Sequence, residues 1–495
     1  MSSRCLITES LLRMFDFNNF SENVAFIDED NHKITYQNLV NTSKQLKEIM
    51  PKRALSFILC KNTFGSAVSY VCNYLNHQVS LLVKADLDAE LLYNLLKQYK
   101  PQYIFLPKEQ ISDINQFFNS KEDQNIILES LAEVYDYSLL KTSYDCSYEI
   151  FDDLCLLLTT SGSTGSPKFV RQSYKNVESN TKEIANYLKL TSEERPITVL
   201  PMYYTYGLSV INSHLQVGAT VLLTDKSIMQ KEFWSFLKDE KATSISGVPY
   251  TYQMLNMLRF TRMDLPNLKT LTQAGGHLNE KLQKLYGDYC LSNGKEFFVM
   301  YGQCEATARM SYLEPSYVSS KIGSIGKPLN NAKFVVIDDN GNEISTPNTQ
   351  GELVYIGDNV TLGYAESYKD LAKGDERKGR LPTGDIVYFD ENGFYFITGR
   401  KKRFLKIFGN RVNLEDVDKL VQEKYPNIEF ASYGIDDHLT LFFTKKNEDK
   451  ADEIKQYVID KLILNPVAFK KVILDKIPRN ETGKILYREL ANYCK

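Results

Sequence analysis

Short apolar runs alternate with segments of helical spacing along the first 300 residues, and this alternation constrains the fold more than any other feature of the chain. Apolar residues recur at helical spacing through residues 36–50, as expected for a helix that packs on a sheet. The predicted strands are residues 24–27 (VAFI), 55–59 (LSFIL), 197–200 (ITVL), 219–223 (ATVLL) and 297–300 (FFVM). The pattern indicates an α/β sheet, in which ligands usually bind where the strands end.

The pattern changes after residue 320. Short β-like segments (KFVVID, GELVYIG, GFYFITG) are separated there by DDNGN and DENG turns, which is typical of hairpins. After Gly399 comes the densest basic run, RKKRFLK, followed by an α+β stretch of a size that suits a small separate domain. We therefore expect a mostly β region and then a small C-terminal domain.

Composition excludes several classes of protein. With 59 Lys+Arg against 62 Asp+Glu, the net charge of -3 creates no global attraction to nucleic acid. The eight cysteines and five histidines form no CxxC pair and no metal-ligand spacing, which argues against a zinc site and a disulfide scaffold. No apolar stretch reaches the ~18 residues of a membrane span, and the N-terminus lacks the features of a signal peptide. We expect a cytoplasmic protein with no nucleic-acid partner and no membrane span.

A loop of small and hydroxyl residues follows an apolar strand at residues 156–168 (LLLTTSGSTGSPK). Small residues let backbone N–H groups approach a polyphosphate, hydroxyls add donors, and a lysine adds positive charge. Pro167 stands where the P-loop of NTPases requires glycine, so this is a different phosphate loop. The alternative is a simple flexible turn. The candidate phosphate-binding residues are Thr160, Ser161, Gly162, Ser163, Thr164, Gly165 and Lys168.

Further motifs follow in order along the chain. They are YGQCE at 301–305, TGD at 383–385, GRKKRFLKIFGNR at 399–411 and NETGK at 480–484, with ITYQNL from Ile34 near the N-terminus. Together with the loop at 156–168, this set resembles the adenylate-forming superfamily of acyl-CoA synthetases, luciferases and nonribosomal-peptide adenylation domains. The resemblance covers the chain from about Ile34 to Lys484.

The resemblance implies the fold and its division. It predicts an α/β protein with a large N-terminal domain, built of two α/β subdomains and a small β-barrel-like subdomain, and a small mobile α+β C-terminal domain. The expected domains are residues 1–401 for the ATP and acyl pocket and 402–495 for a lid that carries the catalytic lysine. Lys402 is the expected hinge, and its basic neighbours Lys401, Arg403 and Lys406 are interpreted as a solvated part of it.

The resemblance also implies the reaction. A carboxylate attacks the α-phosphorus of ATP to give an acyl-adenylate and pyrophosphate, and a thiol then takes the acyl group. Lys484 is expected to bridge the two anions, and Glu305 to hold Mg²⁺. Cys304 stands where the family usually has threonine. A thiol donates more weakly than a hydroxyl, so we expect reduced rather than lost adenylation.

The nucleotide-binding residues follow from the same motifs. Asp385 is expected to accept hydrogen bonds from the ribose. Arg400 resembles the family's arginine that faces the ribose or phosphate; the alternative interpretation of Arg400 is a solvated charge in a basic loop. The expected adenine site comprises Gly275, Gly276, His277, Tyr301 and Gly302.

No aspartate lies between Pro201 and Leu223, where amino-acid-activating members bind the substrate amine, so a carboxylic acid without an α-ammonium is favoured. The expected acyl-pocket residues are Tyr204, Tyr206, Val248, Gly276 and Met300. The thiol belongs either to coenzyme A, which we favour, or to the phosphopantetheine of a separate acyl carrier protein. A luciferase-like or adenylate-only enzyme and a non-catalytic nucleotide-binding homologue stay as alternatives.

Overall fold

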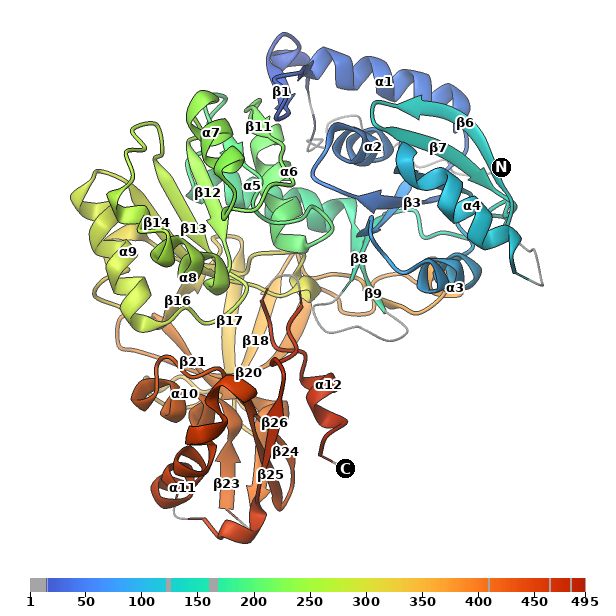
Figure 1. Ribbon diagram of the computed structural model, residues 1–495. Coiled ribbons are helices and arrows are strands. Elements are labelled where there is room, and N and C mark those ends of the chain that lie inside the picture. Colours follow the sequence, from blue (N-terminus) through green and yellow to red (C-terminus); the bar gives the residue numbers. More distant parts are fainter. Residues whose placement is uncertain are drawn as a thin grey trace.

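The computed structural model describes residue 15 and residues 17–121, 126–159, 168–407, 410–462, 464–480 and 483–494. Figure 1 shows two large α/β units side by side, with the C-terminal residues in a smaller lobe beyond them. The mixed α/β architecture with a small C-terminal domain confirms the predicted fold class.

The first sheet lies in the N-terminal part of the chain. All six residues of β3 (Leu55–Cys60) are buried and five of them are apolar, as expected for a parallel strand covered on both faces. The sheet runs in the order β19 (Gly363–Ala365), β9 (Phe169–Ser173), β8 (Leu154–Thr159), β4 (Val79–Lys84), β3 (Leu55–Cys60), β5 (Tyr103–Pro107), β7 (Tyr137–Thr142) and β6 (Leu128–Val134). Its helices are α1 (Tyr36–Ile49), α2 (Phe64–Leu75), α3 (Ala89–Tyr99) and α4 (Ile111–Asn119). The residues predicted to bind phosphate are therefore carried between β8 and β9.

The second sheet has a parallel centre built from the middle of the chain. Its strands are β1 (Val24–Ile27), β2 (Lys33–Thr35), β10 (Pro196–Ile197), β11 (Val221–Leu222), β12 (Ser244–Gly247), β13 (Thr270–Gln273) and β14 (Glu296–Tyr301). The helices of this unit are α5 (Tyr174–Tyr187), α6 (Thr205–Gln216), α7 (Lys231–Asp239), α8 (Pro249–Met257) and α9 (Glu280–Ser292). Ser173, the last residue of β9, caps α5 by accepting the N–H of Asn176 at 3.0 Å, so α5 begins directly where the first sheet ends.

The β-rich region extends this second sheet. The added strands are β15 (Ser311–Leu313), β16 (Ser324–Pro328), β21 (Tyr395–Arg400), β20 (Arg380–Phe389), β18 (Gly351–Gly357) and β17 (Ala332–Ile337). Within the described residues β17 pairs only with β18, so the sheet stays open at that edge. The expected barrel-like subdomain thus takes the form of an open antiparallel extension, because β16 hydrogen-bonds it to the parallel strands through β15.

Beyond Arg400 the chain forms a compact α+β lobe. Its elements are β22 (Phe404–Ile407), β23 (Asn410–Asn413), α10 (Leu414–Lys424), β24 (Phe430–Ile435), β25 (His438–Thr444), α11 (Ala451–Leu462), β26 (Phe469–Leu474) and α12 (Tyr487–Ala491). One apolar cluster made only of residues from Leu405 to Phe469 fills its centre. A core of its own makes this lobe a separate structural unit.

Two strands are shorter than predicted. Of the predicted run at 197–200 only Ile197 lies in a strand, and of the run at 219–223 only Val221–Leu222 do. Beyond Ile197 the chain leaves the ladder, and the Thr198 hydroxyl donates to the carbonyl of Thr224 at 3.0 Å. Apolar residues alone do not separate a buried strand from a buried loop.

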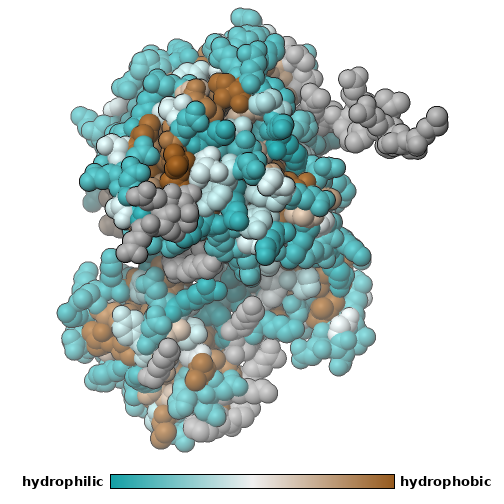
Figure 2. Space-filling model, turned by 90° about the vertical axis from the view of Figure 1, so that its right-hand side faces the viewer, coloured by the Kyte–Doolittle hydropathy of each residue, from teal (hydrophilic) through white to brown (hydrophobic). Residues whose placement is uncertain are grey.

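The surface carries scattered apolar side chains on a mostly hydrophilic face (Figure 2). Single exposed apolar residues of this kind are normal for a folded protein. In the described part of the chain, every helix is too short or too polar to cross a bilayer.

Candidate active site

Lys484 lies where the C-terminal lobe touches α8. The turn that carries it is closed by the Asn480 side chain, whose Oδ1 accepts the Lys484 N–H at 2.9 Å. Gly483 adopts a φ of +76°, and a Cβ there would stand 2.8 Å from Cβ of Tyr250. Glycine is required by both the backbone angle and the close approach. The turn therefore presses its backbone against the N-terminal domain.

The Lys484 ammonium interacts electrostatically with four residues of the predicted site. Its pKa is lowered from the ordinary lysine value because burial removes water, and interactions with Cys304, Glu305 and Asp385 oppose the shift while Arg400 adds to it. Four residues predicted separately from three motifs are thus within electrostatic reach of the predicted catalytic lysine.

Glu305 is held by an aromatic side chain that the sequence did not single out. The Tyr364 hydroxyl donates to Glu305 Oε1 at 2.7 Å. The ring of Tyr364 has Lys168 Nζ 3.9 Å and Arg377 Cζ 4.6 Å from its centroid, both at cation–π distance. The predicted phosphate-binding Lys168 and the predicted magnesium ligand Glu305 are therefore joined through Tyr364.

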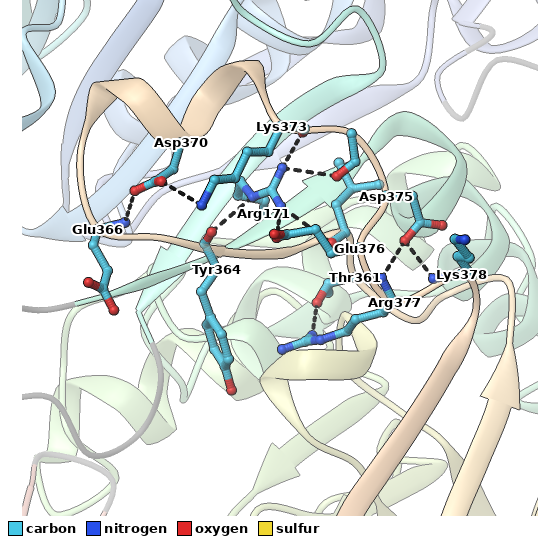
Figure 3. A network of polar contacts seen from close by, with 12 residues as sticks. Arg171, Thr361, Tyr364, Glu366, Asp370, Lys373, Asp375, Glu376, Arg377 and Lys378 are labelled. Atoms are coloured by element: carbon cyan, nitrogen blue, oxygen red, sulfur yellow. Dashed lines mark hydrogen bonds and ion pairs between the residues drawn. The ribbon is translucent and has the colours of Figure 1, made fainter.

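A partly buried network fixes Tyr364 in turn (Figure 3). Arg171 of β9, fully buried, donates from Nε to the Tyr364 carbonyl at 3.0 Å and pairs with Glu376. Thr361 donates its hydroxyl to the Glu305 carbonyl at 3.0 Å. Because Arg171 follows the predicted phosphate loop, the network couples that loop's strand to the Glu305 backbone.

Asp385 is buried, and a polar side chain lies next to each of its carboxylate oxygens. Tyr301 donates its hydroxyl to Oδ2, and Gln303 Nε2 donates to the same oxygen at 2.9 Å. Arg400 Nε lies 2.8 Å from Oδ1 as an ion pair. The structure thus brings together three predicted nucleotide-binding residues and adds Gln303 to them.

The loop after β13 lies against the predicted acyl pocket. Gly275 adopts a φ of +84°, and a Cβ there would stand 2.7 Å from the Tyr204 hydroxyl oxygen. Gly276 and His277 follow and are exposed. The exposed backbone of Gly276 and His277 is accessible to a ligand, and adenine binding at this loop stays a prediction.

The loop after β14 doubles back tightly. A Cβ on Gly302 would stand 1.7 Å from the Ala308 carbonyl oxygen, so only glycine fits. Thr307 holds φ +65° and ψ -63°, and the Ala308 N–H donates to the Ala306 carbonyl at 2.8 Å. This is a strained γ-turn, of the kind that persists where surrounding contacts enforce it.

The predicted acyl-pocket residues lie together, with Gly276 nearby. Tyr206, Val248 and Met300 are buried members of one apolar cluster, and Tyr204 packs against it. Gly276 stands at the rim, where a Cβ would be 3.2 Å from Pro249.

Residues Thr160, Ser161, Gly162, Ser163, Thr164 and Gly165 lie outside the described residues, as does the side chain of the expected hinge Lys402. The interpretation of Arg403 as a solvated charge is wrong: it pairs with Asp418 at 2.8 Å, and its guanidinium lies 4.2 Å from the Tyr487 ring centroid. Both partners belong to the C-terminal lobe, which sequence patterns could not reveal.

Two relatives of this chain are named as acid–CoA ligases. The chain is 29% identical over 354 residues to an oxalate–CoA ligase of Saccharomyces cerevisiae, covering 68% of this chain and 63% of that protein. It is 26% identical over 485 residues to a 2-succinylbenzoate–CoA ligase of Bacillus mycoides, covering 94% of each.

Solved structures share the fold at low identity. An o-succinylbenzoate CoA synthetase of Bacillus subtilis in complex with its acyl-adenylate aligns with a TM-score of 0.75 at 22% identity over 95% of both chains. ATP-bound MatB from Rhodopseudomonas palustris aligns with a TM-score of 0.76 at 19% identity over 97% of both. The family model described as AMP-binding enzyme matches residues 16–365, well over half of the chain. The protein therefore belongs to the AMP-binding enzyme family, the adenylate-forming enzymes.

Proposed function

We propose that the protein is an AMP-forming acid–thiol ligase, which activates a carboxylic acid as acyl-AMP with ATP and transfers the acyl group to coenzyme A. The observation that carries the proposal is the position of Lys484, a lysine of the C-terminal lobe that follows the close approach of Gly483 to Tyr250 and whose charge interacts with Glu305 and Asp385. A cation at that point can draw two anions together while the surrounding protein excludes water.

The remaining site residues have roles consistent with this reaction. Asp385 and Tyr301 are proposed to bind the ribose and adenine, and Lys168 to face the polyphosphate. Mg²⁺ is proposed to bind at Glu305, because a half-buried carboxylate beside Lys168 has the oxygen donors this cation prefers. When bound, the ion would neutralise phosphate charge.

The substrate is proposed to be an acid without an α-ammonium. The pocket cluster of Tyr204, Tyr206, Val248 and Met300 offers no carboxylate to an amine. The acids named for the relatives, oxalate and 2-succinylbenzoate, likewise have no α-ammonium group.

We place the reaction in the cytoplasm. No disulfide joins the cysteines of the described part of the chain, as expected in a reducing compartment.

A screen of carboxylic acids by pyrophosphate release tests the proposal, followed by AMP release with coenzyme A or a phosphopantetheinylated carrier protein. We expect pyrophosphate to be released only when an acid is present, and AMP to be released faster when coenzyme A is added. AMP release with the carrier protein but not with coenzyme A would show that the carrier protein is the acyl acceptor. Nucleotide binding without acid-dependent pyrophosphate release would contradict the proposed function.

A further inference from the structure

Arg309 is a buried cation for which the described residues supply no ion-pair partner. It is 2% exposed and lies four residues after Glu305. Its Nη1 donates to the Tyr187 hydroxyl at 2.8 Å and lies 3.4 Å from Met300 Sδ. Within the described residues Nε has no hydrogen-bond partner and the guanidinium forms no ion pair.

The other fully buried arginine shows what a structural arginine looks like here. Arg171 pairs with Glu376 and donates to the backbone carbonyls of Tyr364 and Gly374. A buried charge without such compensation is strongly destabilising. The contrast indicates that the partner of Arg309 is supplied from outside the chain.

A cavity of ≈ 130 Å³ opens beside Arg309. A cavity of about 150 Å³ holds a molecule of the size of benzene, so this one can receive the end of a small organic acid. Its polar lining includes Arg309, His214, Ser244, Ser246, Thr270 and Thr272. The cavity therefore offers hydrogen-bonding side chains to a polar group.

His214 contributes a second unpartnered group. Its Nδ1 lies 2.8 Å from the Val210 carbonyl, and Nε2 has no partner within the described residues although it is buried. Burial lowers the pKa of His214 to about 4, so the ring is neutral. The charged residues of the cavity wall are Arg309, Lys189, Glu194, Lys269 and Glu296, and Arg309 is the buried one among them. Glu194 also lines the cavity but lies 3.4 Å from Lys269 as an ion pair.

The predicted acyl pocket meets this cavity at Arg309. The Tyr206 ring centroid lies 5.1 Å from the guanidinium carbon, and the Tyr206 hydroxyl lies 2.8 Å from Oγ1 of Thr272 in the cavity wall. Met300, also a pocket residue, contacts Arg309 directly. The strained γ-turn at Thr307 separates Glu305 from Arg309, so one short loop supplies a residue to each end of the site.

We propose that Arg309 binds a carboxylate at the distal end of the substrate, so that the enzyme activates dicarboxylic acids at one carboxyl group and holds the other in this cavity. The inference rests on the proposed function and names its substrate class. The anion would receive charge-assisted hydrogen bonds from Arg309 and hydroxyl donors from Ser246 and Thr272. A monocarboxylate of the same length would leave Arg309 uncompensated.

The test compares α,ω-dicarboxylates from succinate to pimelate, and terephthalate, with the matching monocarboxylates from butanoate to heptanoate, and benzoate. We expect kcat/KM for the best dicarboxylate to exceed that of its match by roughly 100-fold, the value of one charged hydrogen-bond pair. Arg309→Met should reverse this preference by lowering the dicarboxylate rate while the monocarboxylate rate stays or rises. Arg309→Lys should restore part of the preference.

Tyr187→Phe is the matched control, because it removes the hydrogen-bond partner of Arg309 and leaves the charge. It should keep the preference for dicarboxylates. Equal rates for both acid series in the wild type, or an equal loss for both in Arg309→Met, would overturn the inference.

Calorimetric titration of the same acids in the presence of AMP separates this inference from the proposed function. If dicarboxylates bind in an Arg309-dependent way but no pyrophosphate is released, the proposed function is contradicted and the Arg309 subsite is supported. Absence of binding for both series would overturn the subsite.

Discussion

Asp385 and Arg400 stand directly opposite each other in the antiparallel pair β20–β21, and Arg400 Nε lies 2.8 Å from Asp385 Oδ1. The carboxylate is 1% exposed and raises the pKa of Arg400 above its ordinary value. With Tyr301 and Gln303 on the other oxygen, the carboxylate is oriented by the protein itself. A side chain fixed in this way loses little freedom when a ligand joins it.

Asp385→Asn keeps the size of this group and removes its charge. We expect the KM for ATP to rise roughly 10- to 100-fold, the range for charged hydrogen bonds, with a smaller change in kcat. Pyrophosphate exchange measures both constants. Glu352→Gln is the control, because it breaks the 2.8 Å pair with Lys401 one strand away and should leave the KM unchanged. An unchanged KM in Asp385→Asn would exclude its role in nucleotide binding.

Lys484→Ala removes the cation that the C-terminal lobe brings to the site. Adenylation should fall roughly 100- to 1,000-fold, as when one preorganised donor is lost, while coenzyme A transfer from a supplied acyl-adenylate survives. Lys402→Pro at the expected hinge should do the opposite. The exposed Lys470, in the same lobe, gives a control substitution. Equal loss of both half-reactions in Lys484→Ala would refute this division.

The rate of adenylation should fall on the basic side of its pH profile, at a pH below the ordinary pKa of lysine. Burial lowers the pKa of Lys484, and the protonated form is the active one, so the rate falls as pH rises through that lowered pKa. Initial rates of pyrophosphate release across pH 7 to about 11 measure the limb. Lys484→Arg keeps its charge over this range and should lose the limb. A limb that persists in Lys484→Arg belongs to another group.

Cys304→Thr should leave adenylation equal or faster, because a hydroxyl is a stronger donor than a thiol. Cys304→Ala, which has no donor, should be slower than both. Steady-state kcat for pyrophosphate release ranks the three. A large fall in Cys304→Thr would reveal a role for the thiol itself.

Gly483→Val tests the contact between the lobes. The added Cβ would meet Tyr250 at 2.8 Å, and a β-branched residue does not tolerate a φ of +76°. Adenylation should fall at least about tenfold, as expected when a reacting group is misplaced. Transfer from a supplied acyl-adenylate should change less. Lys470→Ala again gives the background, and full adenylation in Gly483→Val would show that this contact does not position Lys484.

Sequence patterns predicted the α/β class, the C-terminal lobe and the motif residues that meet around Lys484. These features depend on local periodicity and contiguous motifs, which a sequence displays directly. The Tyr364 contact to Glu305 spans 59 residues and carries no motif. Arg309 was missed for another reason: a charged residue is expected at the surface, and only tertiary packing shows that it is buried.

Strand β19 pairs with β9, so residues 363–365 complete the outer edge of a sheet whose other strands all come from the first 173 residues. During synthesis on the ribosome, the outer edge of β9 therefore has no partner strand until almost two hundred further residues have been added. Arg171 waits as well, since Glu376 is synthesised later still. An open edge and an unpaired charge favour non-native association, so this sheet is exposed to misassembly until residues 363–376 have been synthesised.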